Sequence, residues 1–134
     1  MPNNPPGVDR PARIGQIAIA VADLDRAVAW YAEVLGLPLL FRAPPGLAFF
    51  DCGGVRLMLS RPEPPGTELR TSVVYYQVAD IHAAHAGLRS RGAALVDEPH
   101  LIARLPDHDL WMSFYHDSEG NLLGLMSEVR PPAA

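Results

Sequence analysis

The sequence has no lysine, so its positive charge comes from 11 arginines, which stand against 15 acidic residues. The net charge of -4, without a basic run, argues against a nucleic-acid partner, because proteins that bind nucleic acids concentrate Lys and Arg on one face. No apolar stretch approaches the ~20 residues of a membrane span. The opening segment MPNNPPGVDRPAR lacks the apolar centre of a secretory signal. We therefore expect a cytoplasmic protein with no membrane partner.

Cysteine is nearly absent as well: Cys52 stands alone, which excludes an internal disulfide and is typical of a reducing cytoplasm. The simplest interpretation of Cys52, in the segment DCGG, is a small turn residue, and the alternative is a reactive thiol. The phosphate-binding patterns GxGxxG and GxxxxGK[ST] are absent too, which argues against a nucleotide cofactor. We expect no cofactor, and a chain of 134 residues is long enough to bury a core without one.

The sequence pattern occurs twice. The segment IGQIAIAVADLDRAVAWYAEVLGL begins as an alternating strand, continues as a helix capped by Asp23 and ends at Gly36. The segment SVVYYQVADIHAAHAGLRSRGA repeats this layout, with Asp80 as the cap and Gly92 as the end of the helix. Further on, AFFDCGGVRLMLS corresponds to SFYHDSEGNLLGLMS. The repeat predicts an α+β fold in which a strand–helix–strand–strand–strand unit occurs in tandem.

Proline-rich segments divide the chain. We expect a flexible tail at 1–12, a first module at about 13–61, a linker at about 62–70, a second module at about 71–128 and a tail at 129–134. Period-two patterns and turn residues predict strands at 14–21, 37–41, 47–51, 55–60, 73–78, 93–97, 109–115 and 121–127. The segment EPHLIARLPDHD is expected to be a long loop near the rim of a binding site.

The clearest strands have one apolar face and one mixed face. Helices are expected to cover the apolar face, as in the strand where Ile17 and Ile19 alternate with Gln16 and Ala18. We interpret the mixed face as the lining of a cavity on the concave side of a curved sheet, and a solvated sheet face is the alternative. The residues that carry this face are Gln16, Arg56, Met58, Ser60, Val73, Tyr75 and Gln77.

The segments IAIAVADLDRAVAWYAEVLGL and FYHDSEGNLLGLM resemble the opening and closing motifs of the vicinal oxygen chelate superfamily. This superfamily includes glyoxalase I, bleomycin-resistance proteins, methylmalonyl-CoA epimerase and extradiol dioxygenases. The resemblance covers about residues 13–128. It implies two βαβββ modules that form a U-shaped mixed sheet around a pocket, with the helices on the outer face, and it implies a homodimer.

The metal enzymes of this superfamily place a ligand on the first and last strand of each module. The resemblance puts these positions at Gln16, Met58, Val73 and Gly124. The divalent ions of such sites prefer nitrogen and oxygen donors. Gln16 offers an amide oxygen and Met58 only a soft thioether, whereas valine and glycine offer no donor. We therefore expect no metal at the usual site.

Two histidines in the expected loop, His100 and His108, provide alternatives. Together with Asp109 they are candidates for a relocated metal site, although their spacing is not diagnostic. They are also the candidate acid or base of a metal-independent enzyme, oriented by Asp107 or Asp109. In that reading Tyr75 donates a hydrogen bond to a developing oxyanion.

The sequence therefore supports three functional hypotheses. The first is a metal-independent protein of the glyoxalase or bleomycin-resistance type that binds an apolar or aromatic small molecule. The second is a metal-independent lyase, isomerase or cyclase, with His108, His100 and Tyr75 as catalytic candidates, and the third is a divalent-metal lyase or dioxygenase with a relocated site. The candidate ligand-binding residues are Gln16, Arg56, Met58, Val73, Tyr75, Gln77, His100, His108, Phe114, Gly124 and Met126.

Overall fold

A computed structural model describes residues 11, 13–62 and 71–132 of the chain. The expected tail at 1–12, except residue 11, and the expected linker at 62–70, except residue 62, lie outside the described residues, as do residues 133–134. The elements follow in the order β1 (Gln16–Ala20), α1 (Leu24–Ala29), η1 (Trp30–Leu35), β2 (Leu39–Ala43), β3 (Leu47–Cys52), β4 (Val55–Ser60), β5 (Val74–Gln77), α2 (Ile81–Ser90), β6 (Ala94–Arg104), β7 (Asp109–His116) and β8 (Leu122–Val129).

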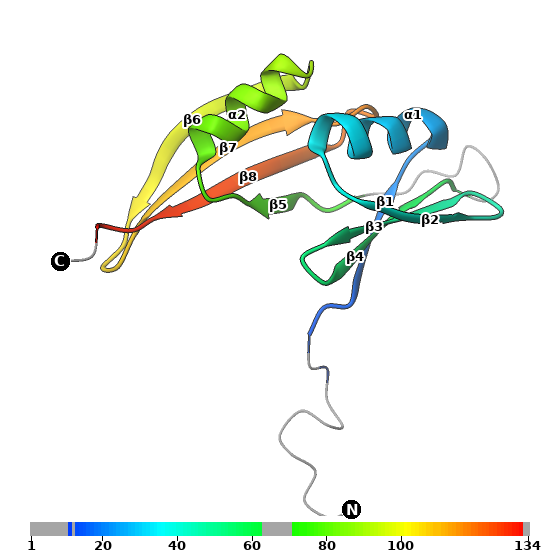
Figure 1. Cartoon of the computed structure of the whole chain (residues 1–134), viewed down its shortest axis with the longest axis horizontal. Coiled ribbons are helices and arrows are strands. Elements are labelled where there is room, and N and C mark those ends of the chain that lie inside the picture. The colour runs from blue at the N-terminus through cyan, green and yellow to red at the C-terminus, as the bar shows by residue number, and fades with distance from the viewer. Residues whose placement is uncertain (1–10, 12, 63–70, 133–134) are drawn as a thin grey trace, which may run out of the picture.

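The expected α+β fold of two βαβββ modules is confirmed. Module one, β1 to β4, has the strand order β1-β4-β3-β2, and module two, β5 to β8, has the same order, β5-β8-β7-β6. In each module the first strand pairs in parallel with the last, and the remaining pairs are antiparallel. Figure 1 shows the two sheets arching side by side, with α1 and α2 on the outside of the arch.

Local sequence explains the helix of module one. The Asp23 carboxylate caps α1 by accepting from the Arg26 amide at 3.0 Å. From Trp30 onward the helix widens into π-helical turns, and it ends at Gly36, whose φ of 85° suits a residue without a side chain. The helical face packs against the apolar face of the sheet in a core of Ile19, Val21, Leu24, Ala27, Tyr31, Ala48, Phe50, Leu57 and Leu59.

Module two repeats these features. Asp80 caps α2 by accepting from the Ala83 amide at 3.1 Å, and Gly92 follows the helix with a φ of 90°. The buried face of this helix presents Ile81 and Leu88 to the sheet. They pack in a second core with Tyr76, Ala93, Tyr115, Leu123 and Leu125. None of the helices among the described residues is long and apolar enough to cross a membrane.

The prediction of a long loop at EPHLIARLPDHD is wrong. Strand β6 continues through this segment to Arg104, and only a short turn separates it from β7. The pairing of β6 with β7 shifts register between Leu95 and Asp97, between Asp97 and His100 and again between Leu101 and Ala103. Each shift resets the alternation of side chains, so the segment shows no sustained period of two. Pro99 is tolerated because β6 lies at the edge of its sheet.

A buried carboxylate joins the two modules. The Tyr31 hydroxyl of module one donates a hydrogen bond to Asp117 Oδ2 of module two, at 2.6 Å. Asp117 also accepts from the backbone amides of Glu119 and Asn121 at 2.8 and 2.9 Å, and from Asn121 Nδ2 at 3.1 Å. Two further residues of the turn after β7 contact module one. Glu119 forms an ion pair with Arg26, and Asn121 Nδ2 donates to the Ala20 carbonyl at 3.3 Å.

Two buried tyrosines have strongly perturbed acidity. Burial, and after it the negative charge of Asp117, raises the pKa of Tyr31 far above its ordinary value. Burial also raises the pKa of Tyr76, with smaller contributions from Cys52 and Asp117. In the unfolded chain both phenols ionise near their ordinary pKa of ~10. Both tyrosines therefore remain protonated in the folded state at a pH where the unfolded chain has lost the protons.

We predict that alkaline pH destabilises the protein through these tyrosines. Their contribution to stability is complete below about pH 10 and is lost above it, at about 1.4 kcal/mol per pH unit for each tyrosine. Tyr76→Phe is expected to remove about 1.4 kcal/mol per pH unit from this loss, because phenylalanine does not ionise. Urea denaturation at a series of pH values between about 9 and 12 measures the slope. An unchanged slope in Tyr76→Phe would contradict the prediction.

Candidate functional site

The face of each sheet opposite the helices is the candidate site, and we call it the inner face. In module two the strand register places residues in rows across this face, because residues directly opposite each other share a side of the sheet. One row contains Tyr75, Gly124, Phe114 and Asp97. The neighbouring row contains Gln77, Met126, Met112 and His100. The register therefore brings most of the expected module-two residues onto one surface.

Tyr75 and Phe114 form the aromatic centre of this surface. Their rings meet edge to face with centroids 5.8 Å apart. They share the space above Gly124, where an added Cβ atom would lie 2.9 Å from the Tyr75 ring and 3.1 Å from the Phe114 ring. A side chain at position 124 would therefore clash with the Tyr75 ring, and the glycine allows the ring to approach β8 this closely.

The inner face of module one is aromatic too. Phe41 stacks on Phe49 with ring centroids 4.6 Å apart, and the Arg56 guanidinium lies 5.6 Å from the Phe49 ring centroid. Next to them, Gln16 Nε2 donates to Met58 Sδ at 3.7 Å. The expected face of Gln16, Arg56 and Met58 is confirmed by the pairing of β1 with β4.

The inner face is open to solvent in the single chain. Tyr75 is 46% exposed, Val73 39% and Phe41 48%. The two sheets are separate four-stranded units, and their inner faces lie on the inside of the arch in Figure 1. Alternation along a strand predicts which face a residue occupies, but the closure of a cavity depends on how whole sheets are placed.

The four positions that the resemblance assigns to metal ligands do not fit a divalent ion. Gln16 offers an amide oxygen, but its Nε2 donates to Met58, whose sulfur is a soft donor. Gly124 has no donor, and the Tyr75 ring covers it. Val73 contributes only carbon atoms. Among residues 11, 13–62 and 71–132, no group of three or more His, Cys, Asp and Glu side chains is placed to hold a metal ion.

The structure does not bring His100, His108 and Asp109 together as a metal-binding group. His100 lies on the edge strand β6, and its Nδ1 atom is 2.8 Å from the Glu98 carbonyl oxygen. His108 lies in the turn between β6 and β7, beyond the last paired residues of the two strands. The expectation that both belong to one rim loop is therefore wrong.

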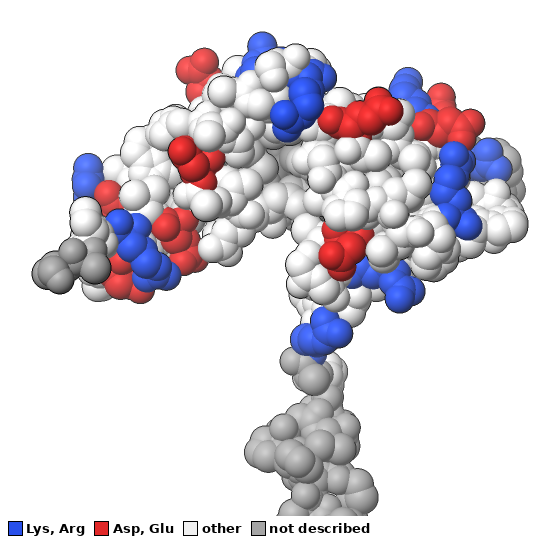
Figure 2. All heavy atoms as spheres, in the orientation of Figure 1, with Lys and Arg blue, Asp and Glu red and all other residues white. Residues whose placement is uncertain are grey.

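His108 nevertheless has a carboxylate partner. Its Nδ1 atom lies 2.8 Å from Asp107 Oδ1, and Arg130 donates to the other Asp107 oxygen at 2.8 Å. The hydrogen bond from Arg130, followed by that from His108, lowers the pKa of Asp107 to about 2, so this carboxylate stays ionised at neutral pH. Figure 2 shows basic and acidic side chains intermingled at this end of module two, without a patch of one sign on the face in view.

Sequence reasoning missed the Phe41–Phe49 pair. Phe41 belongs to the segment LLFRA, whose alternation is interrupted because the register of β2 against β3 shifts between Leu39 and Phe41. The neighbouring strand β3 contains a signal for this pair. Phe49 lies two residues before Asp51, which is paired with Arg56, so Phe49 shares the face of Arg56.

Comparison with known proteins identifies the family. A model of the Glyoxalase/Bleomycin resistance protein/Dioxygenase superfamily matches residues 13–125. The chain belongs to this superfamily. The comparison with curated proteins finds no match. The function proposed below therefore rests on the architecture of the glyoxalase superfamily and on the residues described above.

Solved structures share the glyoxalase-superfamily fold. The crystal structure of TioX from Micromonospora sp. ML1 is 25% identical, with a TM-score of 0.70, and the match covers 88% of this chain and 100% of that chain. The crystal structure of UcmS2 is 24% identical, with a TM-score of 0.70 and coverage of 86% and 97%. Lactoylglutathione lyase from Agrobacterium tumefaciens is 22% identical, with a TM-score of 0.70 and coverage of 87% and 94%.

Proposed function

We propose that this protein of the glyoxalase superfamily binds an apolar or aromatic small molecule on its inner face, without a metal ion. The observation that carries the proposal is the Tyr75 ring lying across Gly124 and against Phe114. At the position where the metal enzymes of the superfamily are expected to carry a ligand, this chain presents an exposed aromatic surface. A flat apolar ligand gains both burial and ring contacts on such a surface.

Polar side chains beside the aromatic rings fix the orientation of the ligand. Gln77 is exposed in the row next to Tyr75, and Gln16 and Arg56 are exposed on the inner face of module one. The remaining candidates, Met58, Val73, Met126 and His100, supply the apolar margin and one further polar group. His108 is outside this group because it lies at the turn between β6 and β7.

A second copy of the chain would cover this surface. An inner face with several large apolar side chains open to water is costly for an isolated chain. We therefore propose a homodimer in which the ligand lies between protein surfaces. The protein is proposed to act in the cytoplasm, where the thiol of Cys52 remains reduced.

A second function, metal-independent acid–base catalysis, is favoured by one observation. Asp107 holds the His108 ring through Nδ1, and the His108 side chain is 13% exposed. It borders an open hollow of about 370 Å³ with Leu105 and Val129 on its walls. In this alternative His108 Nε2 exchanges a proton with a bound substrate. His100 and Tyr75 take no part in such a site, because they lie on the sheet away from this turn.

Native mass spectrometry and elemental analysis of untagged protein, purified without chelator, test the proposal. We expect a species of twice the 14.5 kDa chain mass, no stoichiometric metal, and a non-covalent small molecule that gentle activation removes. One divalent ion per chain would refute the metal-independent site. A metal-free monomer that carries no ligand and gains none from a library of aromatic compounds would refute the binding function.

A further inference from the structure

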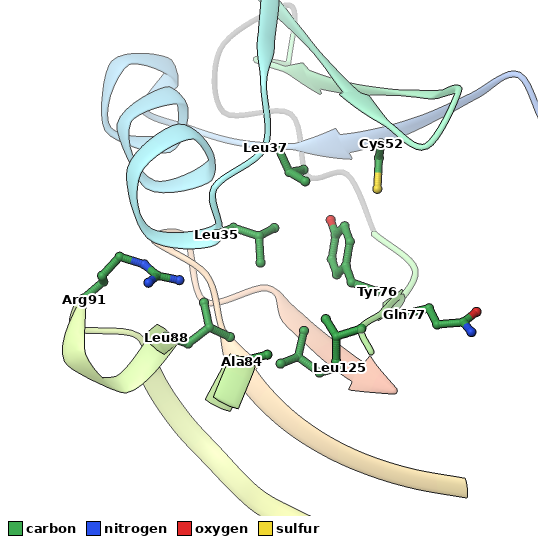
Figure 3. A pocket seen from close by; sticks show the side chains of 10 residues that line it. Leu35, Leu37, Cys52, Tyr76, Gln77, Ala84, Leu88, Arg91 and Leu125 are labelled. Carbon is green, nitrogen blue, oxygen red and sulfur yellow. The ribbon is translucent and has the colours of Figure 1, made fainter. Parts of the chain in front are cut away.

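A cavity lies between the modules on the helix side of the sheets, away from the inner face. Its volume is about 200 Å³. Module one contributes Leu35, Leu37 and Cys52, and the walls from module two come from β5, α2, β8 and Arg91 (Figure 3). Gln77 borders the cavity but turns its side chain away from it, so the cavity is separate from the inner face (Figure 3).

The walls of the cavity are largely apolar and include one buried hydroxyl group. Leu35, Leu88, Ala84 and Leu125 line it with carbon atoms. Tyr76 is only 7% exposed, and its buried hydroxyl oxygen has no hydrogen-bond partner among residues 11, 13–62 and 71–132. The hydroxyl points toward the side chains of Leu37 and Cys52 at the module-one wall (Figure 3). A buried hydroxyl without a partner is unusual in proteins, because leaving it unpaired is costly.

We propose that this cavity is a second binding site, for a small neutral molecule with an apolar body and one carbonyl oxygen that accepts the hydrogen bond of Tyr76. A cavity of about 150 Å³ with apolar walls is known to hold benzene, so about 200 Å³ leaves room for a ring with a short substituent. The hydroxyl oxygen is buried beside Leu37 and Cys52, so the proposal requires the half-buried Leu37 side chain to move aside when the ligand binds. The apolar lining disfavours ligands with further polar groups.

The contacts around the cavity link its occupancy to the arrangement of the modules. Arg91, which borders the cavity, donates through Nε to the Val34 carbonyl at 2.9 Å and so ties the end of α2 to module one. Burial is the largest cause of the raised pKa of Tyr76, so the phenol remains a hydrogen-bond donor throughout the neutral range. A ligand therefore contacts both modules at once and meets a donor, not a negative charge.

Cys52 makes the proposal testable, because it is the single thiol of the chain and lies in the cavity wall. The probes are acetophenone and ethylbenzene, which differ mainly in the carbonyl oxygen. Mass spectrometry follows the rate at which iodoacetamide alkylates Cys52 as either probe is titrated. We expect acetophenone to slow alkylation in a saturable manner. In Tyr76→Phe the preference for acetophenone over ethylbenzene should fall about fivefold, as for the loss of one hydrogen bond.

Two further variants locate the effect. Ala84→Leu fills the cavity from the α2 side and should abolish protection of Cys52. Met58→Arg, on the inner face and outside the hollows that Cys52 lines, should leave the protection unchanged. Failure of the inner-face site and failure of this one are thereby distinguishable. The proposal is overturned if neither probe protects Cys52 up to its solubility, if Tyr76→Phe keeps the full preference for acetophenone, or if Met58→Arg removes the protection.

Discussion

Asp117→Ala is expected to destabilise the protein by about 3 kcal/mol or more. The Asp117 side chain is 6% exposed and accepts from the Tyr31 hydroxyl, two backbone amides and the Asn121 amide. Alanine leaves these donors without their acceptor, and the Tyr31 hydroxyl is too deeply buried to reach water. Because Tyr31 belongs to module one, the loss also weakens the contact between the modules. Urea denaturation followed by tryptophan fluorescence measures the change.

The internal repeat supplies a matched control for this prediction. Asp51 occupies the corresponding turn of module one and is partly exposed. Within the part of the chain that the structure describes, its carboxylate accepts one hydrogen bond, from the Gly54 amide at 3.2 Å. Asp51→Ala is therefore expected to cost about 1 kcal/mol or less. Equal losses at the two positions would mean that Asp117 merely stabilises its own turn. Tyr31→Phe should lower the cost of Asp117→Ala, since the two side chains share one hydrogen bond.

The comparison of Asp51 with Asp117 shows what the sequence can and cannot predict. Both residues stand at matching positions of the repeat, and their local patterns are alike. Asp117 differs in accepting from Tyr31, which lies 86 positions before it in the chain. A local pattern encodes the strand, the turn and the helix cap, because these depend on neighbouring residues. It does not encode which distant side chain will cover the turn.

The same distinction applies to the candidate site. The faces of β1, β4 and β5 were predicted correctly, because an uninterrupted period of two fixes the side of the sheet on which each side chain lies. The extent of β6 was not predicted, because repeated register shifts break that period. The cavity beside Tyr76 was not predicted either. Its walls come from both modules, and only their packing brings Leu35 and Leu88 opposite each other.

Tyr75→Arg is expected to weaken the binding of an apolar probe to the inner face by about 30-fold or more. The suitable probe is N-phenyl-1-naphthylamine, which is neutral, so that the added positive charge does not attract it. Arginine removes the ring that covers Gly124 and places a hydrated guanidinium beside Phe114. Because Tyr75 is 46% exposed, we expect the fold to persist, with a change in unfolding free energy of only about 1 kcal/mol.

Val129→Arg is the matched control for this substitution. Val129 is 47% exposed, and its side chain lies on the face of β8 opposite to that of Met126, outside the inner face. Val129→Arg introduces the same charge and should leave probe affinity unchanged, whereas Met58→Arg, on the inner face of module one, should weaken binding as Tyr75→Arg does. Fluorescence titration gives the affinities and circular dichroism confirms the fold. Unchanged affinity in both inner-face variants would exclude this surface as the binding site. If Tyr75→Arg unfolded the chain, Tyr75 would belong to the core, and the proposed role of the Tyr75–Gly124 contact in recognition would be wrong.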